Sequence, residues 1–164
     1  MRININPTNL IPIELAKKFW KRADGKSNLW AWDLISPSRA SSNIGEFAIL
    51  VPGEEQIVLT KEVFVLRVNK NEFGYSPFYM LWALCLTEVR NQWNRVTLMQ
   101  TNREDVGARY REIKVPRPRS KSWADMVSSA FCDYFQGIAS AKKDLLIQQP
   151  LTVLTILRVL ARLI

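Results

Sequence analysis

The clearest periodic pattern in the sequence covers residues 77–92. Apolar side chains recur there at steps of three and four, at Phe78, Leu81, Trp82, Cys85, Leu86 and Val89. This spacing is typical of an amphipathic helix. Ser76 and Pro77 stand in front of it as a favoured N-cap and a favoured first helical residue. We therefore predict a helix over 77–92 that packs on a sheet.

Shorter apolar runs predict the strands of that sheet. Alternation at Trp30, Trp32 and Leu34 indicates a strand within 29–35, and the apolar runs at 46–51 and 56–68 indicate two more. Further short strands are expected at 96–100 and 113–115, on either side of a polar loop at 101–110, and a short helix is expected over 13–22. Together these elements predict an α/β (α+β) fold with a small mixed sheet and packed helices.

From Ser122 the pattern changes to one long helix, predicted over 122–148. Apolar residues recur at close to 3.5 residues, the spacing of a coiled-coil seam, at Val127, Ala130, Phe131, Tyr134, Ile138, Ala141 and Leu145. A helix of this length measures about 40 Å, which is long for so small a domain to cover. We therefore expect a partner helix, and the alternative is a helix folded back on its own sheet.

Gln149 and Pro150 are expected to end this helix. Residues 149–164 are predicted to form an apolar tail helix, as an oligomer contact or a second core helix. The run LTVLTILRVLARLI has 14 residues, fewer than the roughly 20 that a membrane span needs. The N-terminus MRININPTNLIPIEL has no basic region followed by an apolar core, as a secretory signal would. We expect a cytoplasmic protein without membrane association.

The positive charge of the chain is concentrated in one segment. The 164 residues carry a formal net charge of +8, and residues 90–121 contain nine Lys and Arg, seven of them Arg, against three Asp and Glu. The guanidinium fork suits phosphate oxygens and the edge of guanine. Interleaved Gln100, Thr101, Asn102 and Tyr110 favour a nucleic acid as the partner. The alternative is a solvated basic face or contact with an acidic protein.

Absences limit the catalytic chemistry. The chain has no His, which removes the usual general base and the commonest zinc ligand. Cys85 and Cys132 are 47 positions apart, which favours two buried reduced thiols over a metal or redox site. Asp105, Glu112 and Lys114 resemble the metal-binding end of a nuclease core, where carboxylates hold Mg²⁺ and Lys orients water. A Mg-dependent nuclease is therefore an alternative.

The segment from Asp33 to Leu146 resembles the target-recognition domain of the DNA specificity subunits of type I restriction-modification systems. The resemblance rests on the order of several short features. These are Asp33-Leu34-Ile35, Ser38-Arg39, Gly45, TKEVFVLRV at 60–68, SPFYMLWALCLTEVRNQ at 76–92, RVTLMQTNREDVGARYREIKVPRP at 95–118, and the long helix.

The sequence departs from the family in three ways. Family subunits usually contain two recognition domains and two helices, whereas this chain has a single copy of each. Only about 30 residues precede the matched segment, and Lys121-Ser122-Trp123 stands where the family commonly has a Glu-Gln pair at the start of the helix. Three interpretations stay open: a half-subunit that dimerises, a fragment of a longer gene product, or a degenerate copy.

The resemblance implies a non-catalytic specificity subunit, or half-subunit, that binds duplex DNA sequence-specifically and directs a partner adenine methyltransferase. Residues 1–118 would form the recognition domain, 122–148 the helix that contacts another helix and the methyltransferase, and 149–164 a tail helix. S-adenosylmethionine and Mg²⁺ are expected only on partner subunits, so no cofactor is expected here. The expected partners are double-stranded DNA, a DNA adenine methyltransferase subunit, and a second copy bound through the C-terminal helices.

The candidate DNA contacts follow from residue type and position. Arg103 and Arg109 could fork onto guanine, Asn102 could read adenine, and the cations beside the helix could neutralise phosphates. The full set is Arg39, Arg95, Thr101, Asn102, Arg103, Arg109, Arg111, Arg117, Arg119 and Lys121. A second alternative, besides the nuclease, is a non-catalytic protein-interaction module that uses the long helix.

Overall fold

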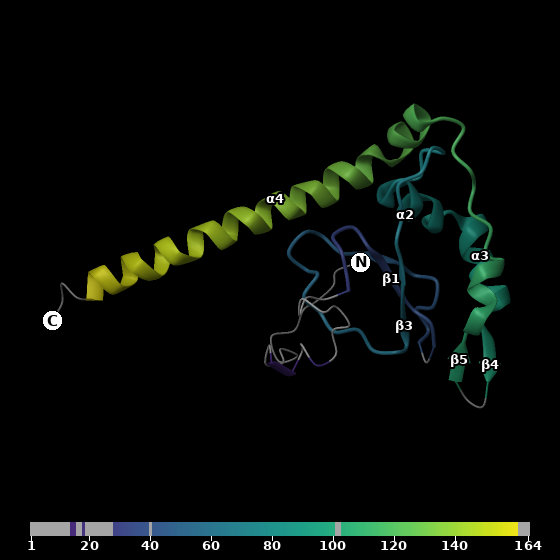
Figure 1. The fold of residues 1–164 in the computed structure, drawn as a ribbon, viewed down its shortest axis with the longest axis horizontal. Coiled ribbons are helices and arrows are strands. Elements are labelled where there is room, and N and C mark those ends of the chain that lie inside the picture. The colour runs from purple at the N-terminus through teal and green to yellow at the C-terminus, as the bar shows by residue number, and fades with distance from the viewer. Residues whose placement is uncertain (1–13, 16–17, 19–27, 40, 101–102, 161–164) are drawn as a thin grey trace.

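The computed structural model describes residues 14–15, 18, 28–39, 41–100 and 103–160, of which 98–105 and 145–160 are described by their backbone alone. The helix predicted over 13–22 lies mostly outside these residues, as do Thr101 and Asn102. The described chain forms a small sheet, two short helices beside it, a hairpin and one long C-terminal helix (Figure 1). The predicted α+β class is confirmed.

Three antiparallel strands form the sheet, in the order β2-β1-β3. They are β1 (Leu34–Pro37), β2 (Ala48–Ile49) and β3 (Val63–Leu66). Leu34 pairs with Ile49 on one side and with Leu66 on the other. Each strand overlaps a predicted apolar run and is shorter than it, and β1 continues two residues past the end of the run at 29–35. No parallel pair occurs among the described strands. The sheet is therefore antiparallel and not mixed.

The strand expected over 29–35 begins late because the chain first makes a turn. Trp32 has a positive φ of 71°, a costly conformation for a bulky residue. Its backbone N–H donates to the Leu50 carbonyl at 2.7 Å, and the Asp33 carboxylate accepts from the Trp30 N–H at 2.8 Å. These bonds hold the turn, so Trp30 and Trp32 do not extend the sheet.

Asp33 also links β1 to β3 through an ion pair with Arg67. Its side chain is 1% exposed and accepts two bonds from Arg67, at 2.7 and 2.6 Å. The guanidinium of Arg67 lies over the exposed Trp30 ring, 4.2 Å from the centroid. The hydrogen bonds to Asp33 raise the pKa of Arg67 against an opposing effect of desolvation. A bidentate pair of this kind ties the start of β1 to the end of β3.

The helix predicted over 77–92 is two helices, α2 (Pro77–Cys85) and α3 (Thr87–Val96). The predicted cap is confirmed, because the Ser76 hydroxyl accepts from the Tyr79 N–H at 3.0 Å. The break lies at Leu86, whose backbone is extended at φ −62° and ψ 138°. It lets α3 turn away from the sheet and bury Trp93 and Val96 in a separate apolar cluster.

The thiols are not buried as the sequence predicted. Cys85 at the end of α2 is exposed, and Cys132 is half-buried. Cys85 is the last residue of α2, and the chain turns at Leu86 directly after it.

A hairpin of β4 (Leu98–Gln100) and β5 (Arg103–Asp105) follows α3 and leads into a 3-10 helix, η2 (Gly107–Glu112). The prediction of a strand at 96–100 is confirmed in β4. The predicted loop at 101–110 instead contains β5 and most of η2, and 113–115 is extended without belonging to a described strand. Glu112 therefore ends a 3-10 helix, and the strand expected around it is absent.

The long helix α4 (Lys121–Leu160) packs its first turns against α2. Trp123 and Val127 contact one apolar cluster of the domain, with Ala124 fully buried in it. Phe131 and Phe135 contact the cluster that contains Leu34 of the sheet. One face of the first half of α4 therefore belongs to the core of its own domain, which corresponds to the alternative of a helix folded back on the sheet.

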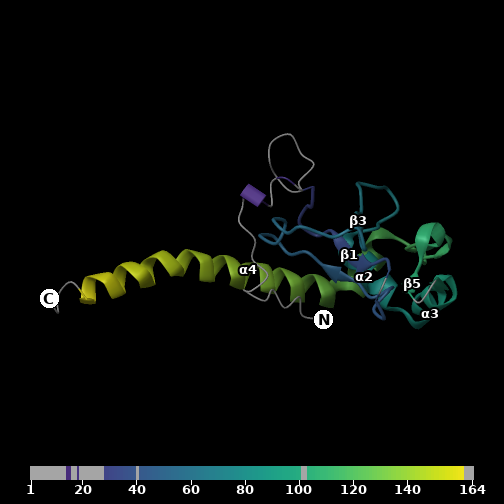
Figure 2. The same ribbon diagram turned by 90° about the horizontal axis from the view of Figure 1, so that it is seen from below.

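The second half of α4 extends away from the rest of the chain (Figures 1 and 2). Lys142 of α4 is ion-paired with Glu54 in the loop after β2. The helix is continuous through Pro150 to Leu160. The prediction of a separate tail helix that begins at residue 149 is therefore wrong. Proline inside a helix costs about 3 kcal/mol. Among the described residues, no helix is long and apolar enough to cross a membrane.

Candidate nucleic-acid interface

The basic segment between η2 and α4 is an extended stretch of chain along one edge of the molecule (Figure 1). We call residues 113–120 the basic ribbon. Ile113 and Val115 pack against the apolar clusters, and Pro118 is buried. The cations next to them, Lys114, Arg117 and Arg119, are exposed. In this extended segment the apolar side chains face the core and the cations face solvent.

Two polar side chains fix the backbone of the basic ribbon. The Gln92 amide on α3 accepts from the Lys114 N–H at 2.8 Å and donates to the Lys114 carbonyl at 2.9 Å. Gln92 thus replaces a neighbouring strand. Further along, the Tyr79 hydroxyl donates to the Pro116 carbonyl at 3.1 Å. Burial raises the pKa of Tyr79, with a smaller contribution from Tyr75, so the hydroxyl remains a donor at neutral and mildly alkaline pH.

Aromatic rings hold the guanidinium groups of the basic ribbon. Arg117 lies over the Phe73 ring at 4.4 Å, and Arg119 lies over the Trp123 ring at 5.7 Å. Among the described residues, neither guanidinium has an acidic group within ion-pair distance. Stacking uses the flat face of a guanidinium and leaves the N–H groups at its edge for another acceptor. The two cations are therefore oriented without being neutralised.

The cations of η2 are arranged differently. Arg109 donates to both oxygens of Glu112, at 3.0 and 3.2 Å. This pair raises the pKa of Arg109 and lowers the pKa of Glu112, in both cases chiefly through the hydrogen bond. Arg111 is exposed and lies 5.7 Å from the centroid of Tyr110. Arg111 is therefore the more available of the two for an external acceptor.

The other candidate contacts surround this edge or lie outside the described residues. Arg95 is exposed in the last turn of α3, and Lys121 is exposed at the start of α4. The Val106 N–H donates to the Ser38 carbonyl at 3.0 Å, which places exposed Arg39 beside the start of η2. Arg103 lies in β5, where only the backbone is described, and Thr101 and Asn102 lie outside the described residues.

The residues of the nuclease alternative are not brought together as a metal site in the described part of the chain. Glu112 is occupied by Arg109, and Lys114 points outward from the basic ribbon. No group of three His, Cys, Asp or Glu among the described residues could hold a metal ion. The side chain of Asp105 is not described.

The predicted partner seam of α4 is divided between two faces. Val127 and Phe131 contact the domain, and Ile138 is half-buried. Ala130, Tyr134 and Ala141 are exposed, with Tyr134 at 63%. Met126 is also 63% exposed, so Met126, Ala130 and Tyr134 form an outward apolar stripe at steps of four. We call these three residues the outer stripe; Leu145 has no described side chain.

Sequence reasoning missed the residues that hold the basic ribbon in place. Gln92 looks like any polar helix residue, and Tyr79 looks like core. The usable signal was the alternation of Ile113, Lys114 and Val115, which predicts extended backbone with one face inward. Comparison of the chain with protein-family models, curated proteins and solved structures found no match.

Proposed function

We propose that the chain binds duplex DNA sequence-specifically, as a specificity subunit or half-subunit of a type I restriction-modification system that directs a partner adenine methyltransferase. The observation that carries the proposal is the basic ribbon. Its two arginines lie over aromatic rings, its backbone is fixed from α2 and α3, and its cations are in none of the ion pairs between described residues. Preorganised, unneutralised cations along an edge suit a row of phosphates.

The charges divide the candidate contacts by role. Lys114, Arg117 and Arg119 on the basic ribbon are phosphate contacts in this proposal, with Lys121 beside them at the start of α4. Positive potential from the N-terminal end of α4 adds to theirs. Arg39 and Arg111, near the start and end of η2, are the candidate base readers. Arg109 would need to exchange Glu112 for a base, so its contribution is expected to be smaller.

Salt dependence of DNA binding tests the phosphate contacts. Fluorescence anisotropy with a pool of randomised duplexes is measured between 50 and 200 mM salt, conditions in which counterion release controls affinity. Arg117→Gln and Arg119→Gln are each expected to reduce the slope of log K against log salt by about 0.9. Lys143→Gln, an exposed cation on α4, is the matched control and should leave the slope unchanged.

Selection of bound sequences tests the base readers. Arg111→Gln is expected to relax the preference at one position of the selected site by about 1–3 kcal/mol, with little change in salt slope. An affinity that is independent of salt, or a selected pool without any preferred sequence, would refute the proposal.

The partner half of the proposal concerns the outer stripe of α4. Co-purification from the source cell is expected to recover an adenine methyltransferase or a second copy of the chain. Tyr134→Glu should reduce that recovery without lowering the melting temperature, because Tyr134 is 63% exposed. Phe131→Ala is the contrasting variant, since it removes a core contact and should destabilise the domain. Equal recovery with Tyr134→Glu would contradict a partner on this stripe.

A further inference from the structure

A second candidate binding site lies where the loop at 42–47 meets α2 and α3. A polar cleft of about 320 Å³ is lined there by hydroxyl and amide side chains, from Ser42, Thr87, Asn91 and Asn94, with Trp93 in its wall. An apolar hollow of about 210 Å³ adjoins it, lined by Phe47, Leu84 and Cys85. The two share Gly45, Glu46 and Arg90. None of these lining residues belongs to the basic ribbon.

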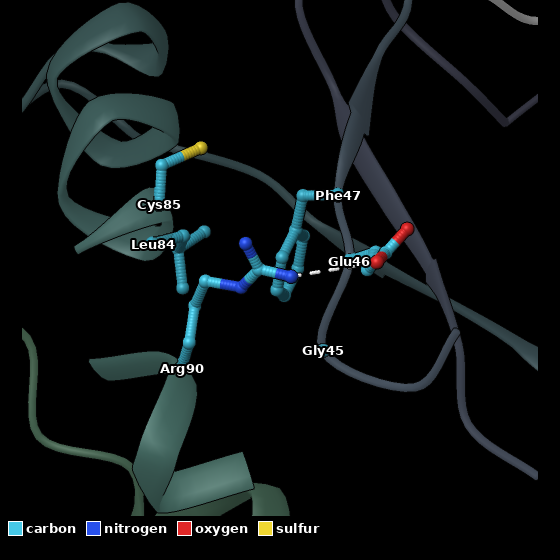
Figure 3. A pocket seen from close by; sticks show the side chains of 6 residues that line it. All are labelled: Gly45, Glu46, Phe47, Leu84, Cys85 and Arg90. Atoms are coloured by element: carbon cyan, nitrogen blue, oxygen red, sulfur yellow. Dashed lines mark hydrogen bonds and ion pairs between the residues drawn. The ribbon is translucent and has the colours of Figure 1, made fainter. Parts of the chain in front are cut away.

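The Arg90 side chain reaches from α3 past Leu84 and Phe47 to Glu46 in the loop (Figure 3). Its Nη2 lies 3.4 Å from the Glu46 carboxylate, and the side chains are 58% and 43% exposed. An ion pair this long and this exposed contributes about 0–1 kcal/mol. A ligand that offers better partners to both groups can therefore replace it at little cost.

The wall of the cleft is rigid on the loop side. Gly45 has φ +86°, and its missing Cβ would lie 2.5 Å from Cγ of Trp93, so the loop backbone rests directly on the indole ring. The Gly45 N–H donates to the buried Ser36 hydroxyl at 3.3 Å. The Trp93 Nε1–H is buried and has no acceptor among the described residues.

The lining selects for a neutral, planar, polar ligand. The charges of Arg90 and Glu46 balance, and Glu46 would repel a phosphate or carboxylate. Asn91, Asn94 and the hydroxyl groups both donate and accept. The Phe47 ring in the adjoining hollow makes edge contacts with Phe64 and Trp93 and adds an apolar aromatic surface beside the polar lining. These features describe a nucleobase better than a phosphate group.

We propose that this cleft binds a single nucleobase, with guanine as the best match. Guanine presents the acceptor O6 beside the N1–H and N2–H₂ donors on one edge. An Arg N–H next to a carboxylate offers the complementary order, with Arg90 donating to O6 and Glu46 accepting from N1–H and N2–H₂. The base can come from a free nucleoside or from an unpaired position in DNA, and both sources present this edge.

Guanosine is the probe for the cleft. Titration calorimetry with guanosine, inosine, adenosine and inorganic phosphate is expected to give the tightest binding for guanosine. Inosine should bind less tightly because it lacks the N2 amino group. Glu46→Gln should weaken guanosine roughly tenfold or more, since it replaces a charged acceptor. Glu88→Gln, an exposed carboxylate of α3 outside the cleft, is the control and should change nothing.

A second readout uses the thiol beside the cleft. Cys85 lines the adjoining hollow, whereas Cys132 lies on α4. Guanosine is expected to slow alkylation of Cys85 by N-ethylmaleimide and to leave Cys132 unaffected. Asn91→Ala, which removes a polar group from the lining, serves as the test variant if Glu46→Gln fails to fold, and it should weaken both the protection and the binding of guanosine.

Three outcomes would overturn the proposal. They are the absence of guanosine binding at millimolar concentration, phosphate binding as tight as guanosine binding, and full guanosine binding by both Glu46→Gln and Asn91→Ala. A duplex with one unpaired guanine, compared with its fully paired form, assigns the source of the base once guanosine binding is established. Duplex binding through the basic ribbon is measured separately by the salt slope, so the two proposals fail independently.

Discussion

Gly45→Ala is expected to destabilise the domain strongly. Two costs add at this position. A residue with a Cβ at φ +86° loses about 1–2 kcal/mol. The new Cβ would also meet Cγ and Cβ of Trp93 at 2.5 and 2.7 Å, and overpacking a tight contact costs about 1–3 kcal/mol. Trp93 is 3% exposed and cannot swing into solvent. The expected total is about 2–5 kcal/mol, a large share of the roughly 5–15 kcal/mol that holds a typical domain folded.

Gly53→Ala is the matched control for the steric cost. Gly53 also has a positive φ, +94°, but nothing lies within 4 Å of the position that a Cβ would take there. It therefore carries the conformational cost alone, about 1 kcal/mol after the loss of chain entropy in the unfolded state is counted. Urea unfolding followed by tryptophan fluorescence gives both values. Equal destabilisation by the two substitutions would refute the close approach of the loop to Trp93, and with it the rigid wall of the guanine cleft.

Three further predictions concern the ion pair of Asp33, the thiol of Cys85 and the hydrogen bonds of Gln92. Asp33→Asn should lower the free energy of unfolding by about 2 kcal/mol, less than a fully buried pair because Arg67 is 32% exposed. Because folding raises the pKa of Arg67, its stabilising effect is complete below the unfolded pKa and is lost only above the folded pKa. The difference in unfolding free energy between the wild type and Asp33→Asn should therefore be constant from pH 7 to 10 in urea melts. Desolvation raises the pKa of Cys85 against the opposing charge of Arg90, so its alkylation at pH 7.5 should be slower than that of free cysteine, and an equal rate would contradict this environment. Gln92→Ala removes both bonds to Lys114 and should weaken DNA binding while costing about 1–2 kcal/mol of stability; unchanged binding would show that the basic ribbon needs no anchor.

Local signals predicted the elements that depend on nearby residues. Ser76 and Pro77 begin α2 as the N-cap rules require, and the apolar runs mark the three sheet strands. The break at Leu86 was not predictable from periodicity, because Val89 continues the same step of three and four across it. After the break, Trp93 of α3 packs in an apolar cluster with Phe47 and Phe64, which are far away in the sequence, and no local pattern shows that contact.

The division of α4 into two faces has the same origin. Its sequence carries apolar residues on more than one side, including Val127, Phe131, Met126 and Tyr134. Periodicity alone cannot say which of them face the domain, since that depends on where α2 lies. The structure assigns Val127 and Phe131 to the domain and exposes Met126 and Tyr134. A 3.5-residue seam was therefore the wrong expectation for the first half of the helix.

The sequence predicted where the positive charge of the candidate interface lies, but not which side chains the cations contact. The sequence located nine cations within 90–121, yet it did not separate Arg109, which is paired with Glu112, from Arg117, which is stacked on Phe73. Phe73 lies 44 positions away from Arg117, so no local pattern links the two. The alternation at 113–115 correctly predicted extended backbone, while its hydrogen-bond partner proved to be the Gln92 side chain.

The same contacts hold the basic ribbon and α4, so the two elements have a fixed orientation to each other. Tyr79 donates to Pro116 on the basic ribbon and packs in the same cluster as Trp123 and Ala124 of α4. The backbone of Lys121, at the junction, lies only 3.0 Å from the position a Cβ would take on Gly74. No flexible linker separates the two elements within the described chain. If DNA binds the basic ribbon as proposed, packing on α2 sets the direction of α4 relative to that DNA, and a partner seated on the outer stripe would keep a fixed orientation to it.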